Sequence, residues 1–468
     1  MKNAALQALL PFAGWSPERV GEVESIGALD PILPTPFKVT ETGAATLAAV
    51  GLAVSDLWEL RTGRRQNLSI DTGHATASLR STNYLRLDGA KVSNEANPVM
   101  GIYPAKEGRW SYLHCNFPHH RAAALKVVGT PEDKRAVTEA VAKWDALELE
   151  EAIIAAGGAG GMVRSAAEWA EHPQGRAVAA LPLMEIVKIG DSPPEALPEG
   201  ERPLSDIRVL DLTRVLAGPT CARNLAEQGA DVLRISAPHL PFITYQEYDT
   251  GLGKLSAHLD LREEKNLGIM RDLVRDCDIF SQGYRPGTLA GRGLSPGELA
   301  ELRPGIICVS LCAFGHEGPW ASRRGFDTAV QVVSGIAARQ GELFPGADGA
   351  PKFYPVSAID YLTGNLMAFG AMVALRKRAE EGGSWLVRTS LAQVGHWLQA
   401  QGEIAMSDLD GVAADFDPAE IEKWSMVTET PMGRLTHLAP VVQFSETPAR
   451  WARPSVPVGH SDPMWPAR

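Results

Sequence analysis

The stretch 206–238, DIRVLDLTRVLAGPTCARNLAEQGADVLRISAP, lacks both patterns by which phosphate-binding loops are usually recognised. It contains no GxGxxG, and its turn TRVLAGP has a single glycine and no Walker lysine. The chain is also poor in cysteine: the residues Cys115, Cys221, Cys277, Cys308 and Cys312 form no CxxC pair. An odd number of unpaired cysteines excludes a disulfide framework and predicts buried free thiols in a reducing compartment.

The chain also has no excess of positive charge. The formal net charge of −11 excludes a broad nucleic-acid-binding surface and attraction to an anionic membrane. The apolar N-terminal stretch AALQALLPFAGW is too short to span a bilayer and shows no clear signal cleavage pattern. With 45% hydrophobic and 22% charged residues, the composition is that of a globular protein, and we expect it in the cytoplasm.

What the stretch 206–238 does contain is a βαβ unit. IRVLDL and ADVLRI are apolar runs with β-branched residues, which is typical of buried parallel strands. Between them, CARNLAEQG has apolar positions at helical spacing and ends at Gly229, a helix stop. The predicted fold is therefore α/β, with a Rossmann-like parallel sheet whose ligand lies beyond the carboxyl ends of the strands, plus a smaller mixed α+β domain.

The same stretch resembles the class III CoA-transferases of the CaiB–BaiF family, which include formyl-CoA and carnitine CoA-transferases and a racemase branch. LDLTRVLAGP and GADVLRI carry the likeness, and it continues through DIFSQGYRPG, VSLCAFGHEGP, RRGFDTAVQVVSG and AIDYLTGNLMAFGAMVAL in the family's order. The resemblance implies CoA transfer between an acyl-CoA and a carboxylic acid, with CoA as a substrate, no permanently bound cofactor and a homodimeric assembly.

The family's parts stand in an unusual order, which predicts a permuted or partly duplicated chain. The expected division is a small-domain-like unit at 1–189, a proline-rich linker at 190–205, a Rossmann-like domain at 206–401 and an extended C-terminal tail at 402–468. An apolar helix, a glycine turn and a strand occur twice, once around RTGRRQNLSIDTG and once at 365–391. We interpret these two segments as an internal partial repeat.

Asp360 is the first candidate for catalysis. It stands at the expected start of a helix, where the helix dipole favours a carboxylate anion, as a nucleophile requires. In the family that the chain resembles, the matching aspartate attacks the acyl-CoA thioester and passes through a mixed anhydride and an aspartyl-CoA thioester. The other copy of the repeat has Glu41 near the corresponding place, and we expect one working carboxylate in each chain.

A racemase would need a second group for proton transfer. The racemase branch has a GHD triplet, and here the triplet is Gly325–Phe326–Asp327, whose phenylalanine cannot move protons. Asp327 is therefore expected to be structural, capping a helix. Two alternatives stay open: isomerisation or dehydration of an acyl-CoA with Asp360 as base, and a non-catalytic acyl-CoA-binding protein.

The resemblance also implies the residues that contact CoA. Tyr284 and Arg285 lie in GYRPG, Arg292 follows a few positions later, Lys254 lies in GKLSAHLDL, and Val215 with Leu216 lies in TRVLAGP, near the acyl–pantetheine region. Leu216 is apolar, which favours a hydrophobic acyl group over a small dicarboxylate. Departures from the family's motifs at Gly283 and Leu255 predict altered CoA contacts.

The segment SYLHCNFPHHR concentrates His114, Cys115, His119 and His120. Zinc sites have defined spacings such as CxxC or HxxxH, and these residues are too closely bunched, with Pro118 interrupting any helix. We expect histidines of a loop or interface and no metal.

Overall fold

The computed structural model describes residues 3–93 and 97–467. Its centre is a seven-stranded sheet in the order β11-β10-β9-β12-β13-β14-β8, in which only β8 runs antiparallel to its neighbour. This confirms the predicted α/β fold. The strands are β8 (Glu185–Gly190), β9 (Arg208–Leu212), β10 (Asp231–Ser236), β11 (Lys254–His258), β12 (Ile279–Gln282), β13 (Ile307–Cys312) and β14 (Ser384–Ser390).

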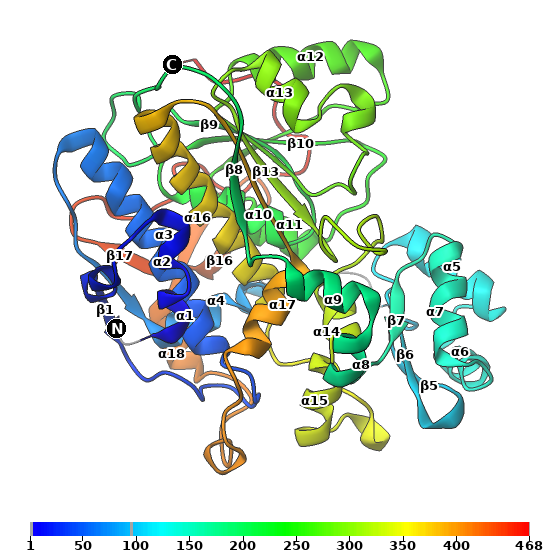
Figure 1. Cartoon of the computed structure of the whole chain (residues 1–468). Helices are drawn as coiled ribbons and strands as arrows, with labels where there is room; N and C mark the ends of the chain where they lie inside the picture. Colours follow the sequence, from blue (N-terminus) through cyan, green and yellow to red (C-terminus); the bar gives the residue numbers. More distant parts are fainter. Residues whose placement is uncertain (1–2, 94–96, 468) are drawn as a thin grey trace.

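Helices cover both faces of this sheet (Figure 1). The connections between its parallel strands contain helices. The strands β9, β12 and β13 are almost entirely buried, which explains why their sequences read as continuous apolar runs. The helices in this part of the chain are α10 (Ala217–Glu227), α11 (Thr244–Thr250), α12 (Glu264–Arg275), α13 (Pro296–Leu302), α14 (Asp327–Val333), α15 (Ile336–Leu343), α16 (Ala358–Glu381) and α17 (Leu391–Ala400). Of these, α14 and α15 lie below the sheet in Figure 1.

A lobe of residues 97–164 stands beside the sheet, at the right of Figure 1. Its antiparallel strands have the order β5-β6-β7, and Glu107 and Gly108 form the hairpin turn between β5 and β6 with positive φ angles. Asp133 caps the second helix of the lobe. The elements are β5 (Gly101–Pro104), β6 (Trp110–Leu113), β7 (Gly160–Met162), α5 (Pro118–Val128), α6 (Lys134–Val141) and α7 (Ala146–Ala155), followed outside the lobe by α8 (Ala166–Glu171) and α9 (Pro173–Ala180).

Residues near both ends of the chain build the remaining sheets. Helix α4 ends at Ser78, and two short strands, β3 and β4, follow it. The four-stranded sheet has the order β15-β16-β3-β4, and the three-stranded sheet has the order β1-β2-β17. These elements are α1 (Ala4–Gln7), α2 (Leu10–Ala13), β1 (Val23–Ile26), α3 (Val39–Thr62), β2 (Leu68–Asp71), α4 (Thr72–Ser78), β3 (Arg86–Leu87), β4 (Ala90–Lys91), α18 (Pro418–Trp424), β15 (Ser425–Thr430), β16 (Gly433–Leu438) and β17 (Val442–Phe444).

The internal repeat is visible as two equal sets of elements. Helices α3 and α16 each have 24 residues, end in a glycine and lead into a strand and a further helix. In both sets the strand pairs with one parallel and one antiparallel neighbour, as β1-β2-β17 and as β13-β14-β8. The strand of the N-terminal set, β2, lies in a three-stranded sheet, whereas the strand of the other set, β14, lies in the seven-stranded sheet.

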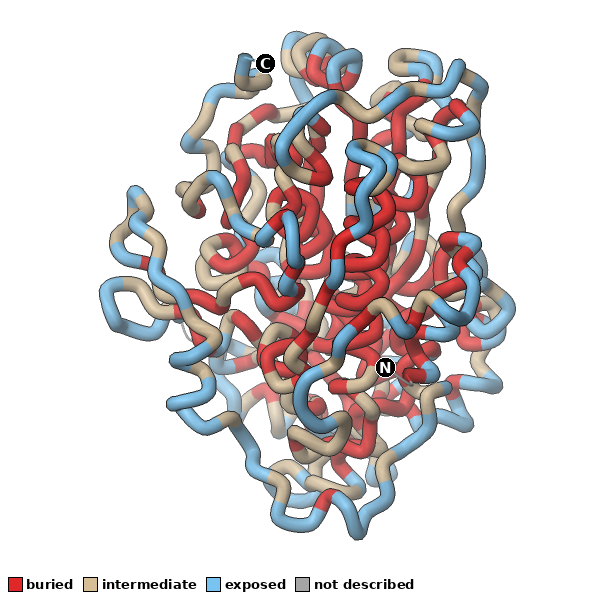
Figure 2. Tube along the Cα trace, turned by 90° about the vertical axis from the view of Figure 1, so that its left-hand side faces the viewer, coloured by how far each residue is buried: buried red, intermediate tan, exposed pale blue. Residues whose placement is uncertain are grey.

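The two long helices pack against each other in the centre of the protein. By length and hydropathy both could cross a membrane, but 89% of the most apolar window of α3 and all of that of α16 are buried inside the protein. Figure 2 shows the resulting buried core, which runs through the length of the molecule beneath exposed loops. Residues 3–93 therefore pack against the sheet-bearing part of the chain, and the predicted domain boundaries stay a prediction.

Candidate active site

Asp360 lies in the first turn of α16 and faces a cavity of about 270 Å³. The side chain is 8% exposed, and within residues 3–93 and 97–467 its carboxylate has no ion pair or hydrogen-bond partner. A buried polar group without a partner is costly, so such a group is a candidate for a reacting group that faces a ligand.

The second acid at this helix end is Asp327, the first residue of α14. Its Oδ2 accepts a hydrogen bond of 3.1 Å from the backbone amide of Asp360, and its Oδ1 accepts one of 2.5 Å from Gln331. The Asp327 side chain therefore caps α16. The sequence predicted that Asp327 caps a helix but did not identify which one.

Burial and the nearby charge of Asp327 raise the pKa of Asp360 well above its ordinary value. This direction opposes the expected stabilisation of the anion by the helix end. Desolvation of the charged form and a like-charged neighbour outweigh the attraction of the helix dipole. Burial likewise raises the pKa of Asp327. Each of these two buried acids therefore makes ionisation of the other less favourable.

The turn before α10 forms one wall of the cavity, through Val215, Leu216 and Ala217. Val215 has φ +73°, a left-handed conformation that is strained for a β-branched residue. Backbone strain of this kind is common at functional sites. The amino end of α10 lies at this wall through Ala217, and its dipole can stabilise negative charge on an oxygen.

Gly364 allows α10 and α16 to approach this closely. A Cβ atom on Gly364 would lie 2.5 Å from the carbonyl oxygen of Ala217 and 2.7 Å from Cβ of Thr220. The missing side chain therefore sets the distance between the strained turn and the first turn of α16 that carries Asp360.

Lys254 lines neither this cavity nor the adjoining one. Its ammonium group is buried and donates to Oδ2 of Asp211 at 2.9 Å and to the carbonyl oxygen of Pro219 at 2.8 Å. In this position it holds the end of β9 against α10, so it does not provide the CoA contact expected from the sequence. Its effect on the site is to support the Val215 turn.

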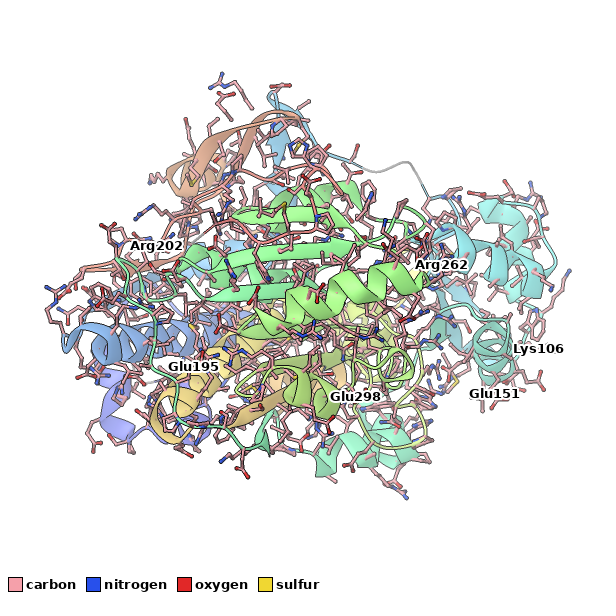
Figure 3. All side chains as sticks on the ribbon, turned by 90° about the horizontal axis from the view of Figure 1, so that it is seen from above. Lys106, Glu151, Glu195, Arg202, Arg262 and Glu298 are labelled. Carbon is pink, nitrogen blue, oxygen red and sulfur yellow. The ribbon has the colours of Figure 1, made fainter. Side chains whose placement is uncertain are left out.

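The remaining predicted CoA contacts lie along two adjoining cavities. Tyr284 and Arg285 line the cavity of Asp360, and Arg292 lines a second cavity of about 130 Å³. Leu212, Tyr284 and Thr288 belong to both walls, so the two spaces adjoin. Arg262 also lines the second cavity, and Figure 3 shows it on the side of the sheet that faces the lobe.

The histidine cluster forms part of the cavity wall. His119 and His120 line the cavity at the amino end of α5, and His114 stacks on Phe326 with ring centroids 3.8 Å apart. Within the described ranges no group of three or more His, Cys, Asp or Glu side chains is arranged to hold a metal ion. Sequence reasoning missed Arg214 and Arg324, which also line the cavity, although the pair RR directly before GFD was a visible signal.

Residues 204–420 match the family described as CoA-transferase family III. These residues form a domain of this family. The protein is an enzyme of the CoA-transferase class, and the matched residues contain the seven-stranded sheet except β8, together with Asp360. The first 203 residues lie outside that match.

Among curated relatives, acetyl-coenzyme A transferase nodX of Hypoxylon pulicicidum is 28% identical over 80% of this chain and 70% of its own length. Human succinyl-CoA:glutarate CoA-transferase is 34% identical over 37% of this chain and 41% of its own length. A probable fatty acyl-CoA transferase of Mycobacterium tuberculosis is 30% identical over 46% of this chain and 56% of its own length. The chain thus spans about half the length of the last two.

Among solved structures, that of the hypothetical protein Rv3272 of Mycobacterium tuberculosis is similar with a TM-score of 0.39, at 30% identity, over 43% of this chain and 58% of the other.

Proposed function

We propose that the protein transfers CoA from an acyl-CoA to a carboxylic acid through covalent intermediates on Asp360. The observation that carries the proposal is a buried carboxylate with no protein partner in a cavity of about 270 Å³, within a domain of this family. A nucleophile that is desolvated and unpaired is available for attack once it loses its proton.

The proposed transfer consists of four steps at Asp360. A carboxylate oxygen of Asp360 attacks the thioester carbonyl carbon, the carbon–sulfur bond breaks and CoA leaves as thiolate. The thiolate then attacks the Asp360 carbonyl of the mixed anhydride, which releases the donor acid and leaves an aspartyl-CoA thioester. The acceptor carboxylate repeats these two steps in reverse order and departs as the new acyl-CoA.

The surroundings of Asp360 support this chemistry. The amino end of α10 offers amides to the oxygen that becomes negative when the thioester is attacked. Asp327 holds the first turn of α16 and, through its charge, controls when Asp360 is ionised. Each step passes through an oxyanion at the attacked carbonyl and releases an anion, either a thiolate or a carboxylate, so a wall of partial positive charge assists both directions.

The two adjoining cavities fit the shape of CoA as a substrate. The second cavity combines apolar side chains such as Leu259 and Leu289 with Arg262 and Arg292, which suits a base and its phosphates. The uncharged pantetheine arm would then pass Tyr284, which borders both cavities, and bring the thioester to Asp360.

The identity of the acids is a separate part of the proposal. Several relatives are named for dicarboxylic acids, such as the succinyl-CoA–D-citramalate CoA-transferase of Chloroflexus aurantiacus, 34% identical over 39% of this chain. Others are named for acetyl-CoA or fatty acyl-CoA. We propose a carboxylic acid with an apolar chain, because Leu212, Leu216, Leu311 and Leu391 line the cavity.

The experiment is mass spectrometry of the protein after incubation with acyl-CoAs and hydroxylamine, which traps an activated carboxylate as a hydroxamate. We expect the hydroxamate on Asp360 in the wild-type protein and on no residue in Asp360→Asn. The variant Glu41→Gln is the matched control, since Glu41 has the same position in α3 that Asp360 has in α16. An unmodified Asp360 in a protein that binds acyl-CoA would overturn the covalent mechanism.

The same samples test isomerisation of an acyl-CoA. His120 stands in the cavity, but burial lowers its pKa to about 3, which makes it a weak base at neutral pH. Exchange of the α-hydrogen with deuterated water in the absence of any acceptor acid would favour the isomerase over the transferase. CoA binding with neither labelling nor exchange would indicate a binding protein.

We also propose a cytoplasmic location and a homodimer. Cys115, Cys221, Cys277, Cys308 and Cys312 are all buried free thiols, which suits a reducing compartment. The homodimer is the assembly that the family resemblance implies. The packing of α3 on α16 within one chain supports the alternative, a monomer that completes this helix pair by itself. Light scattering tests the assembly: a single species at the dimer mass is expected, and one at the monomer mass would overturn it.

A further inference from the structure

An uncompensated cationic cluster, Arg214, Arg285 and Arg324, lines the cavity of Asp360. None of the three has a carboxylate within ion-pair distance in the part of the chain that the structure describes, whereas the neighbouring Arg323 pairs with Glu150 at 3.1 Å. The charge of Arg285 adds to burial in lowering the pKa of Arg324. In a protein of net charge −11, an unpaired cluster of this kind is a site for an anion.

The amino end of α5 adds to this cluster from the lobe. Phe117, His119 and His120 line the same cavity, and the ring of Phe117 lies 5.4 Å from the guanidinium carbon of Arg214. The helix has 11 residues, so its amino end carries partial positive charge. His120 is 3% exposed, and its Nδ1 has no hydrogen-bond partner within the described residues.

Both histidines are neutral at physiological pH. Burial lowers the pKa of His119 and His120, and the charges of Arg214 and Arg324 lower both further. Neutral imidazoles add no charge to the cluster, but each can donate one hydrogen bond to an oxyanion. Two guanidinium groups of the cluster, those of Arg214 and Arg324, therefore line the same space as this helix end and these hydrogen-bond donors.

A CoA-transfer reaction brings two kinds of oxyanion to the protein, phosphates of CoA and carboxylates of the acids. The phosphates are separated from the sulfur by the uncharged pantetheine arm, and the second cavity has its own cations, Arg262 and Arg292. A phosphate beside Asp360 would leave the thioester outside the cavity. A second carboxylate of the acid substrate can bind beside Asp360 without keeping the thioester out of the cavity.

We infer that Arg214 and Arg324, with the amino end of α5 and His120, bind the free carboxylate of a dicarboxylic acid whose other carboxyl group reacts at Asp360. The inference rests on the proposed CoA transfer and names the class of its acid substrate. It revises the expectation that Leu216 disfavours dicarboxylates: the leucines lie along the methylene chain, and the arginines bind its far end.

The test is calorimetric binding of adipate and hexanoate to the CoA-free protein. The two acids have the same six-carbon chain and differ by one terminal carboxylate. We expect adipate to bind the wild-type protein at least about tenfold more tightly, as one charge-assisted contact provides. Arg214→Gln and Arg324→Gln should each remove most of this preference without changing hexanoate affinity, and the exposed Arg135→Gln should keep it. Equal affinities in the wild-type protein would overturn the inference.

Steady-state kinetics separates the acid from CoA. We expect Arg214→Gln and Arg324→Gln to raise the KM of a dicarboxylic acid about tenfold and to leave the KM of the acyl-CoA unchanged, while Arg292→Gln should do the reverse. A rise confined to the KM of the acyl-CoA would assign the cluster to a phosphate and overturn the inference. Hydroxamate labelling of Asp360 tests the transfer mechanism separately from this binding site. If the protein prefers adipate but Asp360 is not labelled, the result contradicts the proposed CoA transfer and still supports the carboxylate-binding site.

Discussion

Asp327 accepts a hydrogen bond of 3.1 Å from the backbone amide of Asp360, 33 residues further along the chain. One acid therefore both fixes the helix turn that carries the other and raises its pKa through charge. The N-terminal repeat has the same arrangement. Asp30 accepts hydrogen bonds from the amides of Thr40 and Glu41 at 3.0 and 2.8 Å, and Glu41 is the third residue of α3 as Asp360 is of α16.

Glu41→Gln should leave turnover within about twofold of the wild-type rate. Neither of the two adjoining cavities is lined by Glu41, and within residues 3–93 and 97–467 the ion-pair partner of its side chain is Lys38, at 3.9 Å. The free energy of unfolding should change by less than about 0.5 kcal/mol, because a partly exposed ion pair contributes little. Parallel activity and melting measurements check this, and a large loss of activity would reveal a second working carboxylate.

Asp327→Asn should shift the acidic limb of the pH–rate profile to lower pH by about one unit. Asparagine can still accept from the Asp360 amide, but it no longer opposes ionisation of Asp360, so the pKa of Asp360 falls. The measurement is kcat/KM from pH 5 to 9. A uniform loss of activity at every pH would instead show that Asp327 acts only by holding the helix.

Asp360→Asn should make the protein more stable at pH 8, by about 1–2 kcal/mol. A carboxyl group whose pKa is raised by folding favours the folded state below its unfolded pKa, about 3.9, and this contribution is lost as pH rises through the folded value. The asparagine variant avoids that loss. Denaturant melts at pH 8 and at pH 3.5 provide the check, because the difference should be largest at pH 8.

Val215→Gly should be more stable than Val215→Ala by about 1–2 kcal/mol. Both variants lose the valine side chain, but only glycine adopts φ +73° without strain. Comparing the two variants cancels the loss of packing. Equal melting temperatures would mean that the left-handed conformation is absent in solution.

Gly364→Ala should destabilise the fold by about 1–3 kcal/mol and lower kcat. The added methyl group would meet the carbonyl of Ala217 and move the amino end of α10 away from Asp360. Gly268→Ala is the matched control: it is also a helical glycine, but its Cβ would have no atom within 4 Å, so helix propensity should make it neutral or slightly stabilising. A Gly364→Ala protein with normal turnover would show that this spacing does not matter.

The sequence by itself determined the class of fold, the family and the first catalytic candidate. Alternation of buried β-branched runs with amphipathic helices is a local pattern, and β9, α10 and β10 follow it closely. The partial repeat was also readable, because each copy keeps its helix, glycine and strand in order.

Tertiary structure decided the chemistry around Asp360. Its raised pKa depends on burial and on Asp327, which chain order places 33 residues away and folding places at one helix end. Lys254 was assigned to CoA by position, yet folding buries it against Asp211. His120 lies in the lobe of residues 97–164 and Arg324 lies outside it, and folding places both in the wall of one cavity. Charge balance and burial are sums over neighbours in space, and a linear sequence does not specify those neighbours.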